Sequence, residues 1–400
     1  MASPKFQIPP EFQSKLRHVE PLDARSDEEI LEYLRNPPPV TAEKNIWAFW
    51  HSGIDNIPSW CRRNIINWAR LCGPSWTIRV LDDVPDSPSN ALNWVKRDQL
   101  PEAFVAHKME GPRVWTGPHS ADFLRGICLY QYGGAWVDVG SILVRTIDDL
   151  CWKHLEDPTS PYQVAAPWLY GTVVGNHFIA SRKGDPFIKH WHDVFMALWK
   201  GHNSSDGIAA NPLIAFAHNM NTDGMEARNF KWNWNAPLPK LMEYVAQIVC
   251  WIRVAAIQEP NGGFNGVDYY DKKVLLHDSL REAWPAEAVI GFNGEELFDL
   301  FSVKLDADPE SEEYKKAYNV VWTILTTSTM QKVTHAAGMT STKALGTLWD
   351  MKENENRDQE PGTFAELLRY GSVHFEQNRE IKYITPPKAE FVLEKGVLEP

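Results

Sequence analysis

Apolar and amphipathic stretches alternate between positions 45 and 200 in a way that predicts a parallel α/β sheet. The apolar run NIWAFW at 45–50 is typical of a buried strand, and WTIRVLDD at 76–83 predicts a second one. Residues 57–71 between them repeat apolar side chains at helical spacing, and Gly73-Pro74 ends that pattern. Strand, helix and strand in this order predict a βαβ unit.

The same alternation continues along the chain. HSADFLRGICLYQY at 119–132 predicts a helix with Ser120 as its N-cap, and Gly133-Gly134 stops it. AWVDVGSILV at 135–144 then predicts the next strand. We expect further strands at 163–168 and 176–183 and an amphipathic helix at 185–200.

Four segments follow from these patterns. Residues 1–44 are Pro-rich and charged and predict an N-terminal arm, while 45–205 carry the α/β core. Residues 206–375 show a mixed, Trp-rich and largely helical pattern, and 376–400 predict a peripheral C-terminal tail. The fold class that we expect is α/β, a Rossmann-like sheet with a helical C-terminal addition.

Composition narrows the functional classes. The 400 residues are 44% hydrophobic, enough for a large core. A net charge of -12 argues against general nucleic-acid binding, which needs clustered cations. The five cysteines show no zinc-like spacing and fit reduced thiols. The sequence contains no run of about 18 apolar residues and therefore predicts no membrane span. The N-terminus also lacks an apolar signal core, so we expect a cytoplasmic protein.

One segment carries candidate chemistry. Asp122 and Arg125 lie three residues apart on a predicted helix and therefore share a face. After Gly133-Gly134, the next strand brings Asp138 to its carboxyl end, where open α/β sheets bind their ligands. Carboxylates and a guanidinium at that edge can bind sugar hydroxyls, phosphate oxygens or a divalent cation.

This segment resembles the Asp-x-x-Arg and Gly-Gly-x-x-x-Asp signature of the glycosyltransferase sugar-binding region that carries a DxD motif. Yeast-type mannosyltransferases, capsular polysaccharide synthesis proteins and clostridial glucosylating toxins share that region. The sequence is most similar to the fungal capsular-polysaccharide type, whose members glycosylate secondary metabolites such as triterpenoids. The resemblance covers roughly residues 45–200 and implies a GT-A fold, with 45–205 binding the nucleotide sugar and 206–375 on the acceptor side.

The resemblance also implies roles for individual residues. Asp122 and Arg125 would contact the donor sugar, Trp50 at the end of the first strand would stack on the nucleobase, and Asp138 would be the first acid of the DxD. The family's second acid, a direct ligand of Mn²⁺ or Mg²⁺, is replaced here by Gly140. Metal dependence is therefore open. Asp138 alone, Ser141, or an acid or histidine from the C-terminal half can complete a weaker metal site, or Arg125 can offset the diphosphate charge without a metal.

The function that we expect is transfer of a hexose from a UDP- or GDP-sugar to a small, apolar acceptor such as a triterpenoid. One alternative is an arginine-containing cyclodipeptide synthase on the same fold, for which tRNA would be the nucleic-acid partner. A second is an inactive sugar-binding module, suggested by Gly140. His335 and His374 are late candidates for contacts to the donor phosphates.

Overall fold

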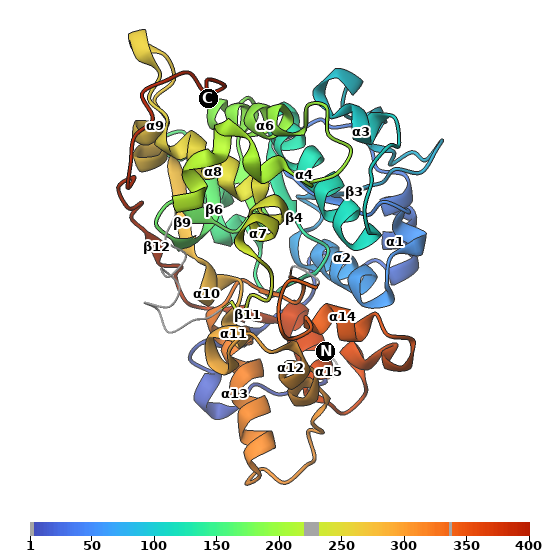
Figure 1. The fold of residues 1–400 in the computed structure, drawn as a ribbon. Coiled ribbons are helices and arrows are strands. Elements are labelled where there is room, and N and C mark those ends of the chain that lie inside the picture. Colours follow the sequence, from blue (N-terminus) through green and yellow to red (C-terminus); the bar gives the residue numbers. More distant parts are fainter. Residues whose placement is uncertain (1–3, 220–231, 336–337) are drawn as a thin grey trace.

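The computed structural model describes residues 4–219, 232–335 and 338–400 and places a mixed sheet between layers of helices (Figure 1). Parallel pairing joins β2 to β3 and β4, and β6 to β9, while β8 runs antiparallel to β4 and β6. The carboxyl ends of the parallel strands therefore meet at one edge. The strand order is β3 (Thr77–Leu81), β2 (Asn45–Phe49), β4 (Gly134–Val137), β8 (Phe178–Ser181), β6 (Val164–Tyr170), β9 (Val274–Asp278) and β12 (Tyr383–Ile384), with β7 (Val173–Val174) beside β6.

Side chains on the two faces of the sheet pack in separate apolar cores. Trp47 and Phe49 of β2 pack in one core, and their neighbours Ile46 and Ala48 pack in the other. This alternation is the period of two that a buried strand requires when both of its faces are covered. The apolar run at 45–50 therefore reflects a central strand, as its pattern predicts.

Helices cover both faces of the sheet, and a helical group lies below it in Figure 1. On one face, α4 packs on β2 and on α6, which in turn packs on α8. On the other, α2 contacts β3 and α15. The main helices are α1 (Asp27–Arg35), α2 (Ser59–Cys72), α4 (Arg113–Tyr132), α6 (Pro186–Trp199), α7 (Leu238–Tyr244), α8 (Ala246–Ala256), α9 (Gly266–Lys273), α11 (Pro285–Ile290), α12 (Gly294–Ser302), α13 (Glu312–Thr327), α14 (Leu345–Trp349) and α15 (Phe364–His374). Short helices α3 (Glu102–Val105), α5 (Lys153–Glu156) and α10 (Ser279–Glu282) connect them.

The predicted α/β class is confirmed, but two local predictions are wrong. The helix at 119–132 begins earlier, at Arg113, so Ser120 is not its N-cap; the Ser120 hydroxyl donates to the Thr116 carbonyl inside the helix at 2.8 Å. The strand expected at 135–144 is two strands, β4 and β5 (Ser141–Leu143). The chain leaves the sheet between them, and β5 pairs with β10 (Met330–Lys332) instead.

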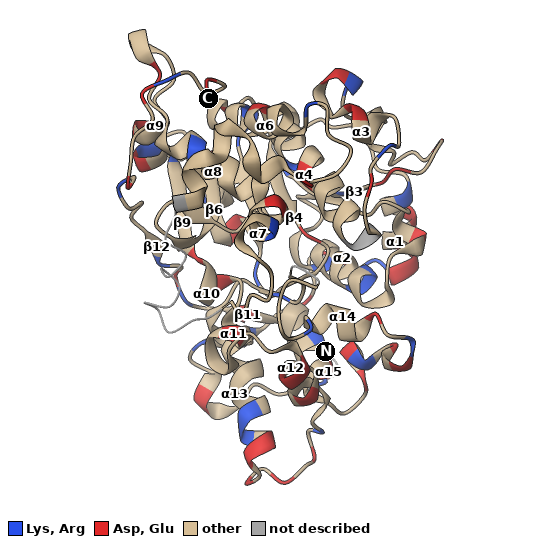
Figure 2. Ribbon diagram, in the orientation of Figure 1, with Lys and Arg blue, Asp and Glu red and all other residues tan. Residues whose placement is uncertain are grey.

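Both ends of the chain join the rest of the protein through strand pairing. In the N-terminal arm, β1 (Leu16–His18) pairs with β11 (Phe375–Gln377), and in the tail β12 pairs with β9 at the sheet edge. All five cysteines are buried and unpaired. Lys, Arg, Asp and Glu residues are spread along the outer helices and loops of the ribbon (Figure 2). Within the described ranges, no helix combines the length and apolar character that crossing a membrane requires.

Candidate active site

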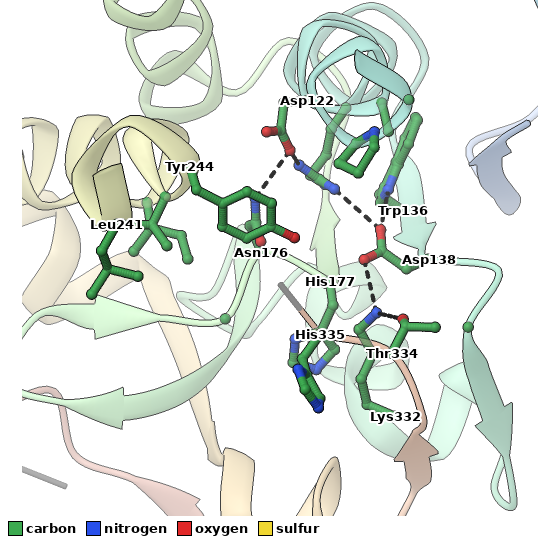
Figure 3. A pocket seen from close by; sticks show the side chains of 18 of the residues that line it. Asp122, Trp136, Asp138, Asn176, His177, Leu241, Tyr244, Lys332, Thr334 and His335 are labelled. Atoms are coloured by element: carbon green, nitrogen blue, oxygen red, sulfur yellow. Dashed lines mark hydrogen bonds and ion pairs between the residues drawn. The ribbon is translucent and has the colours of Figure 1, made fainter. Parts of the chain in front are cut away.

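A cavity of about 630 Å³ opens at the carboxyl edge of the parallel strands. Residues that follow β2 and β4 line it, together with one side of α4, the loop between β7 and β8, helices α7 and α8, and the segment after β10. Figure 3 shows its polar end, where several charged side chains point toward one another. This is the edge at which the strand pattern predicts a ligand site.

Helix α4 carries Asp122 and Arg125 into the cavity, as their spacing predicts. Both side chains are nearly buried, with 9% and 3% of their surface exposed. Arg125 Nη1 donates to Asp122 Oδ1, and the guanidinium lies over the Trp136 ring, 5.2 Å from its centroid. The pair is therefore a buried, oriented unit of the cavity wall and not a solvated surface ion pair.

Two glycines make the turn from α4 into β4. Gly133 and Gly134 have φ angles of 70° and 100°, a region that favours glycine. A Cβ atom at Gly134 would lie 2.3 Å from the carbonyl oxygen of Asn45. The two glycines thus allow β4 to lie directly against β2 and to end with Asp138 inside the cavity.

Asp138 accepts hydrogen bonds from one side chain of α4 and one side chain of β4. Its Oδ1 lies 3.1 Å from Arg125 Nη2 and 3.1 Å from Trp136 Nε1. Its backbone amide donates to the His177 carbonyl at 2.9 Å. The carboxylate remains 28% exposed, so a ligand in the cavity can reach it.

Burial alone would raise the pKa of Asp138, but the positive charges of Lys332 and Arg125 outweigh it and lower the pKa to about 2. The carboxylate is therefore ionised at every physiological pH. It can accept hydrogen bonds or hold a cation, but it cannot act as a general acid.

A cation from the C-terminal part of the chain lies beside Asp138. Lys332 Nζ lies 3.2 Å from Asp138 Oδ2 and also donates to the Thr334 hydroxyl (Figure 3). Pairing of β10 with β5 sets Lys332 opposite Ser141, and the Val333 amide donates to the Gly140 carbonyl at 2.9 Å. Sequence reasoning missed this lysine, because no local pattern links it to the Asp138 segment.

Thr334 of the same segment fills the space beside Gly140, the position where the DxD resemblance leads one to expect a second acid. A Cβ atom at Gly140 would lie 2.3 Å from Thr334 Oγ1 and 2.6 Å from its Cγ2. Any larger residue at position 140 must therefore displace Thr334. In the part of the chain that the structure describes, no cluster of three or more His, Cys, Asp or Glu side chains gathers in metal-binding geometry.

A second set of residues holds the Asp122–Arg125 pair in place. Gln247 of α8 accepts hydrogen bonds from Arg125 Nη1 and, at 3.0 Å, from Asn176 Nδ2. Its own amide donates to the Asp122 carbonyl at 2.5 Å, and Asn176 donates to Asp122 Oδ1 at 3.1 Å. Gln247 is 1% exposed. A buried polar side chain needs hydrogen-bond partners, and those of Gln247 are the site residues Asp122, Arg125 and Asn176.

Two histidines line the cavity near Lys332. His335, one of the two late candidates, lies there against Phe292, whereas His374 packs on Tyr370 outside the lining residues. His177, which the sequence did not single out, stacks on Trp284 with centroids 5.2 Å apart. Burial, reinforced by the Lys332 charge, lowers the pKa of His177 to about 3 and that of His335 to about 4. Both imidazoles are therefore neutral at pH 7.

Trp50 lies at the carboxyl end of β2, as its position in the sequence predicts. It directly follows β2, lines the cavity, and its amide donates to the Leu81 carbonyl at 2.9 Å. Its ring is tilted against His51, with centroids 5.6 Å apart. The indole Nε1 is buried and has no hydrogen-bond partner among the described residues.

Away from the charged end, the cavity wall is apolar. Trp232 stacks on Trp234 with centroids 5.4 Å apart and packs edge-on against Trp284 at 4.6 Å. Leu238 and Leu241 of α7 continue this wall. The cavity thus joins a charged end to an aromatic and aliphatic end, which suits a ligand pair of mixed polarity.

The chain therefore folds as an α/β protein with a cavity at the carboxyl edge of its sheet, the edge where α/β enzymes bind small ligands. Residues 4–208 match the model of the family described as capsular polysaccharide synthesis protein. The chain belongs to this family, and the match extends into the N-terminal arm, beyond the segment in which the motifs lie.

Curated fungal relatives match nearly the whole chain. The probable glycosyltransferase FCK3 of Fusarium pseudograminearum is 49% identical over 98% of this chain and 99% of its own length. The O-glycosyltransferase braB of Annulohypoxylon truncatum is 40% identical over 98% of this chain and 94% of its own. The protein is therefore an enzyme of glycosyl transfer.

Among solved structures, the PaToxG glycosyltransferase aligns with 56% of this chain and 92% of its own at 17% identity. The TM-score of this alignment is 0.30.

Proposed function

We propose that this glycosyltransferase moves a hexose from a UDP- or GDP-sugar to a hydroxyl group of a small, apolar acceptor such as a triterpenoid. The observation that carries the proposal is a single cavity with a charged end at Asp122, Arg125 and Asp138 and an aromatic end at Trp232 and Trp284. The relative braB carries the name O-glycosyltransferase, which supports an oxygen acceptor.

The charged end suits the donor. Asp122 and Asp138 offer carboxylate oxygens to sugar hydroxyls, and Arg125 between them offers guanidinium N–H groups. Trp50 lines the cavity at the carboxyl end of β2, where a nucleobase can stack on its indole ring. The fold that we propose is accordingly of the GT-A type, with the donor across the ends of β2 and β4.

The apolar end suits the acceptor. The stacked pair Trp232–Trp234 and the edge-on Trp284 form flat surfaces next to the aliphatic side chains of α7. A fused-ring acceptor gains most from such walls, because apolar burial contributes roughly 25 cal/mol per Å². Its hydroxyl would then face the sugar held at the charged end.

In the reaction, the acceptor oxygen forms a bond to the anomeric carbon of the sugar. The bond between that carbon and the diphosphate oxygen breaks, and its electron pair leaves with the nucleoside diphosphate. The acceptor proton passes to solvent or to the departing phosphate. Holding donor and acceptor in one cavity supplies the proximity that this displacement needs.

The test is a transfer assay with mass detection. UDP-glucose, UDP-galactose, UDP-N-acetylglucosamine and GDP-mannose are each offered with polycyclic alcohols, using the natural protein and Asp138→Asn. Asp308→Asn, at an exposed site outside the cavity lining, serves as the matched control. We expect one donor to be consumed with a product one hexosyl unit heavier, and at least a tenfold loss of turnover in Asp138→Asn only.

Equal turnover in a folded Asp138→Asn protein would remove this residue from the site. A product formed only from amino acids, ATP, tRNA and synthetases, and abolished by ribonuclease, would favour the cyclodipeptide-synthase alternative. Donor binding without any transfer would favour the inactive sugar-binding module.

A further inference from the structure

The place that a metal ligand occupies in the family's DxD motif is closed in this protein. Thr334 fills the space that a side chain at position 140 would need, since a Cβ there would lie 2.3 Å from Thr334 Oγ1. The remaining acid, Asp138, has both oxygens engaged: Oδ1 by Arg125 and Trp136, and Oδ2 by Lys332 at 3.2 Å. One carboxylate already bound by two cations is a poor donor set for Mg²⁺ or Mn²⁺, which need oxygen ligands in an open octahedral arrangement.

We propose that Lys332 is a catalytic residue whose ammonium group binds the diphosphate of the donor and stabilises its charge as it leaves, in the place of a divalent cation. The inference rests on the proposed function, because it assigns a partner to the diphosphate of that reaction. Asp138, besides facing the donor sugar, then orients this ammonium group, and Thr334 fills the space left by Gly140.

The geometry around Lys332 supports this role. An ammonium group has three N–H donors, and contacts to Asp138 and Thr334 use two of them. The side chain is 8% exposed and lines the cavity, so its third donor can serve a ligand inside. In a site this shielded from water, a fixed cation stabilises developing negative charge far more than it would in solvent.

The surrounding charges make the lysine a substitute for the metal and not an addition to it. Lys332 pairs with Oδ2 of Asp138 (Figure 3), and Arg125 pairs with Oδ1 of the same carboxylate. A divalent cation placed at Asp138 would meet two positive charges within contact distance and would have to displace at least one. A diphosphate, by contrast, carries negative charge and meets two positively charged hydrogen-bond donors, Lys332 and Arg125.

The test measures nucleoside-diphosphate binding by calorimetry, with UDP and GDP as probes, in EDTA and in manganese. The variants are Lys332→Met, Lys332→Gln and the charge-conserving Lys332→Arg. Lys153→Met, 65% exposed and outside the cavity lining, is the matched control. Melting curves establish which variants fold. Uridine and guanosine, which lack phosphate, report on the base site alone.

For the natural protein we expect a dissociation constant that differs by less than about threefold between EDTA and manganese. The two neutral variants should bind the diphosphate at least about tenfold more weakly, with nucleoside binding unchanged within about twofold, and Lys332→Arg should recover most of the loss. The same variants should lose turnover in parallel when the donor is consumed.

Binding by the natural protein only in manganese, or equal diphosphate affinity in a folded neutral variant, would overturn the assignment of Lys332 while leaving the proposed glycosyl transfer intact. If both neutral variants fail to fold, the comparison of EDTA with manganese in the natural protein decides alone. If the natural protein binds neither UDP nor GDP in either buffer, the proposed donor is wrong, and the role of Lys332 falls with it.

Discussion

Replacing Gln247 with methionine should weaken both the stability of the protein and its use of the donor. The side chain is 1% exposed and makes three polar contacts: it accepts from Arg125 and Asn176 and donates to the Asp122 carbonyl. Methionine has a similar volume but satisfies none of them. The effect should therefore be one of lost hydrogen bonds, with little contribution from a cavity.

The magnitude follows from the partners. A buried hydrogen bond to a charged group contributes about 1.5–3 kcal/mol, and each neutral one contributes about 1 kcal/mol. One contact to Arg125 and two neutral contacts therefore predict a loss of about 4 kcal/mol in the free energy of unfolding. Arg125 then loses one of its three side-chain hydrogen-bond partners, so kcat/KM should fall by about tenfold or more.

Urea unfolding measures the stability change, and the transfer assay measures kcat and KM separately. Gln359→Met, at an exposed position of the same residue type, controls for the substitution itself. A loss below about 1 kcal/mol in Gln247→Met, together with unchanged kcat/KM, would refute the reasoning that this glutamine holds the site.

Three further predictions concern separate parts of the molecule. Trp50→Ala should weaken UDP or GDP binding by about tenfold, because base stacking contributes about 1–3 kcal/mol; calorimetry that shows unchanged affinity would contradict this role. Gly140→Asp should lower stability by about 1–3 kcal/mol through its clash with Thr334, and adding Thr334→Gly should recover most of that loss in urea unfolding. Burial raises the pKa of Glu287 to about 7, so the folded protein holds a proton that the unfolded chain, with a pKa near 4.5, has lost. Stability of the natural protein should therefore fall as pH rises between those values, and Glu287→Gln should be more stable by about 3 kcal/mol above pH 7; equal unfolding curves at pH 8 would contradict this.

The part of the site that local spacing encodes could be predicted from the sequence. Asp122 and Arg125 share a helical face, and the glycine pair that follows leads directly into the strand that ends at Asp138. Each of these steps depends on residues within one helix, turn and strand, where periodicity and glycine conformation decide the outcome. The buried strand at 45–50 and the helix α6 were predictable for the same reason.

The rest of the site depends on contacts between distant segments. Gln247 reaches Arg125 from 122 residues later in the chain, and Lys332 reaches Asp138 because β10 pairs with β5 outside the main sheet. A lysine in a short strand and a glutamine in an apolar helix carry no local sign of function. The departure of β5 from the sheet was missed because its apolar residues continue the pattern of β4 without a break.

The most direct test of the account is a crystal structure with the nucleoside diphosphate that the donor screen selects, grown in the presence of manganese. The account predicts the base stacked on Trp50, a diphosphate oxygen within hydrogen-bond distance of Lys332 Nζ, and no manganese between the diphosphate and Asp138. A manganese ion that joins Asp138 to the diphosphate, with Lys332 displaced, would contradict it.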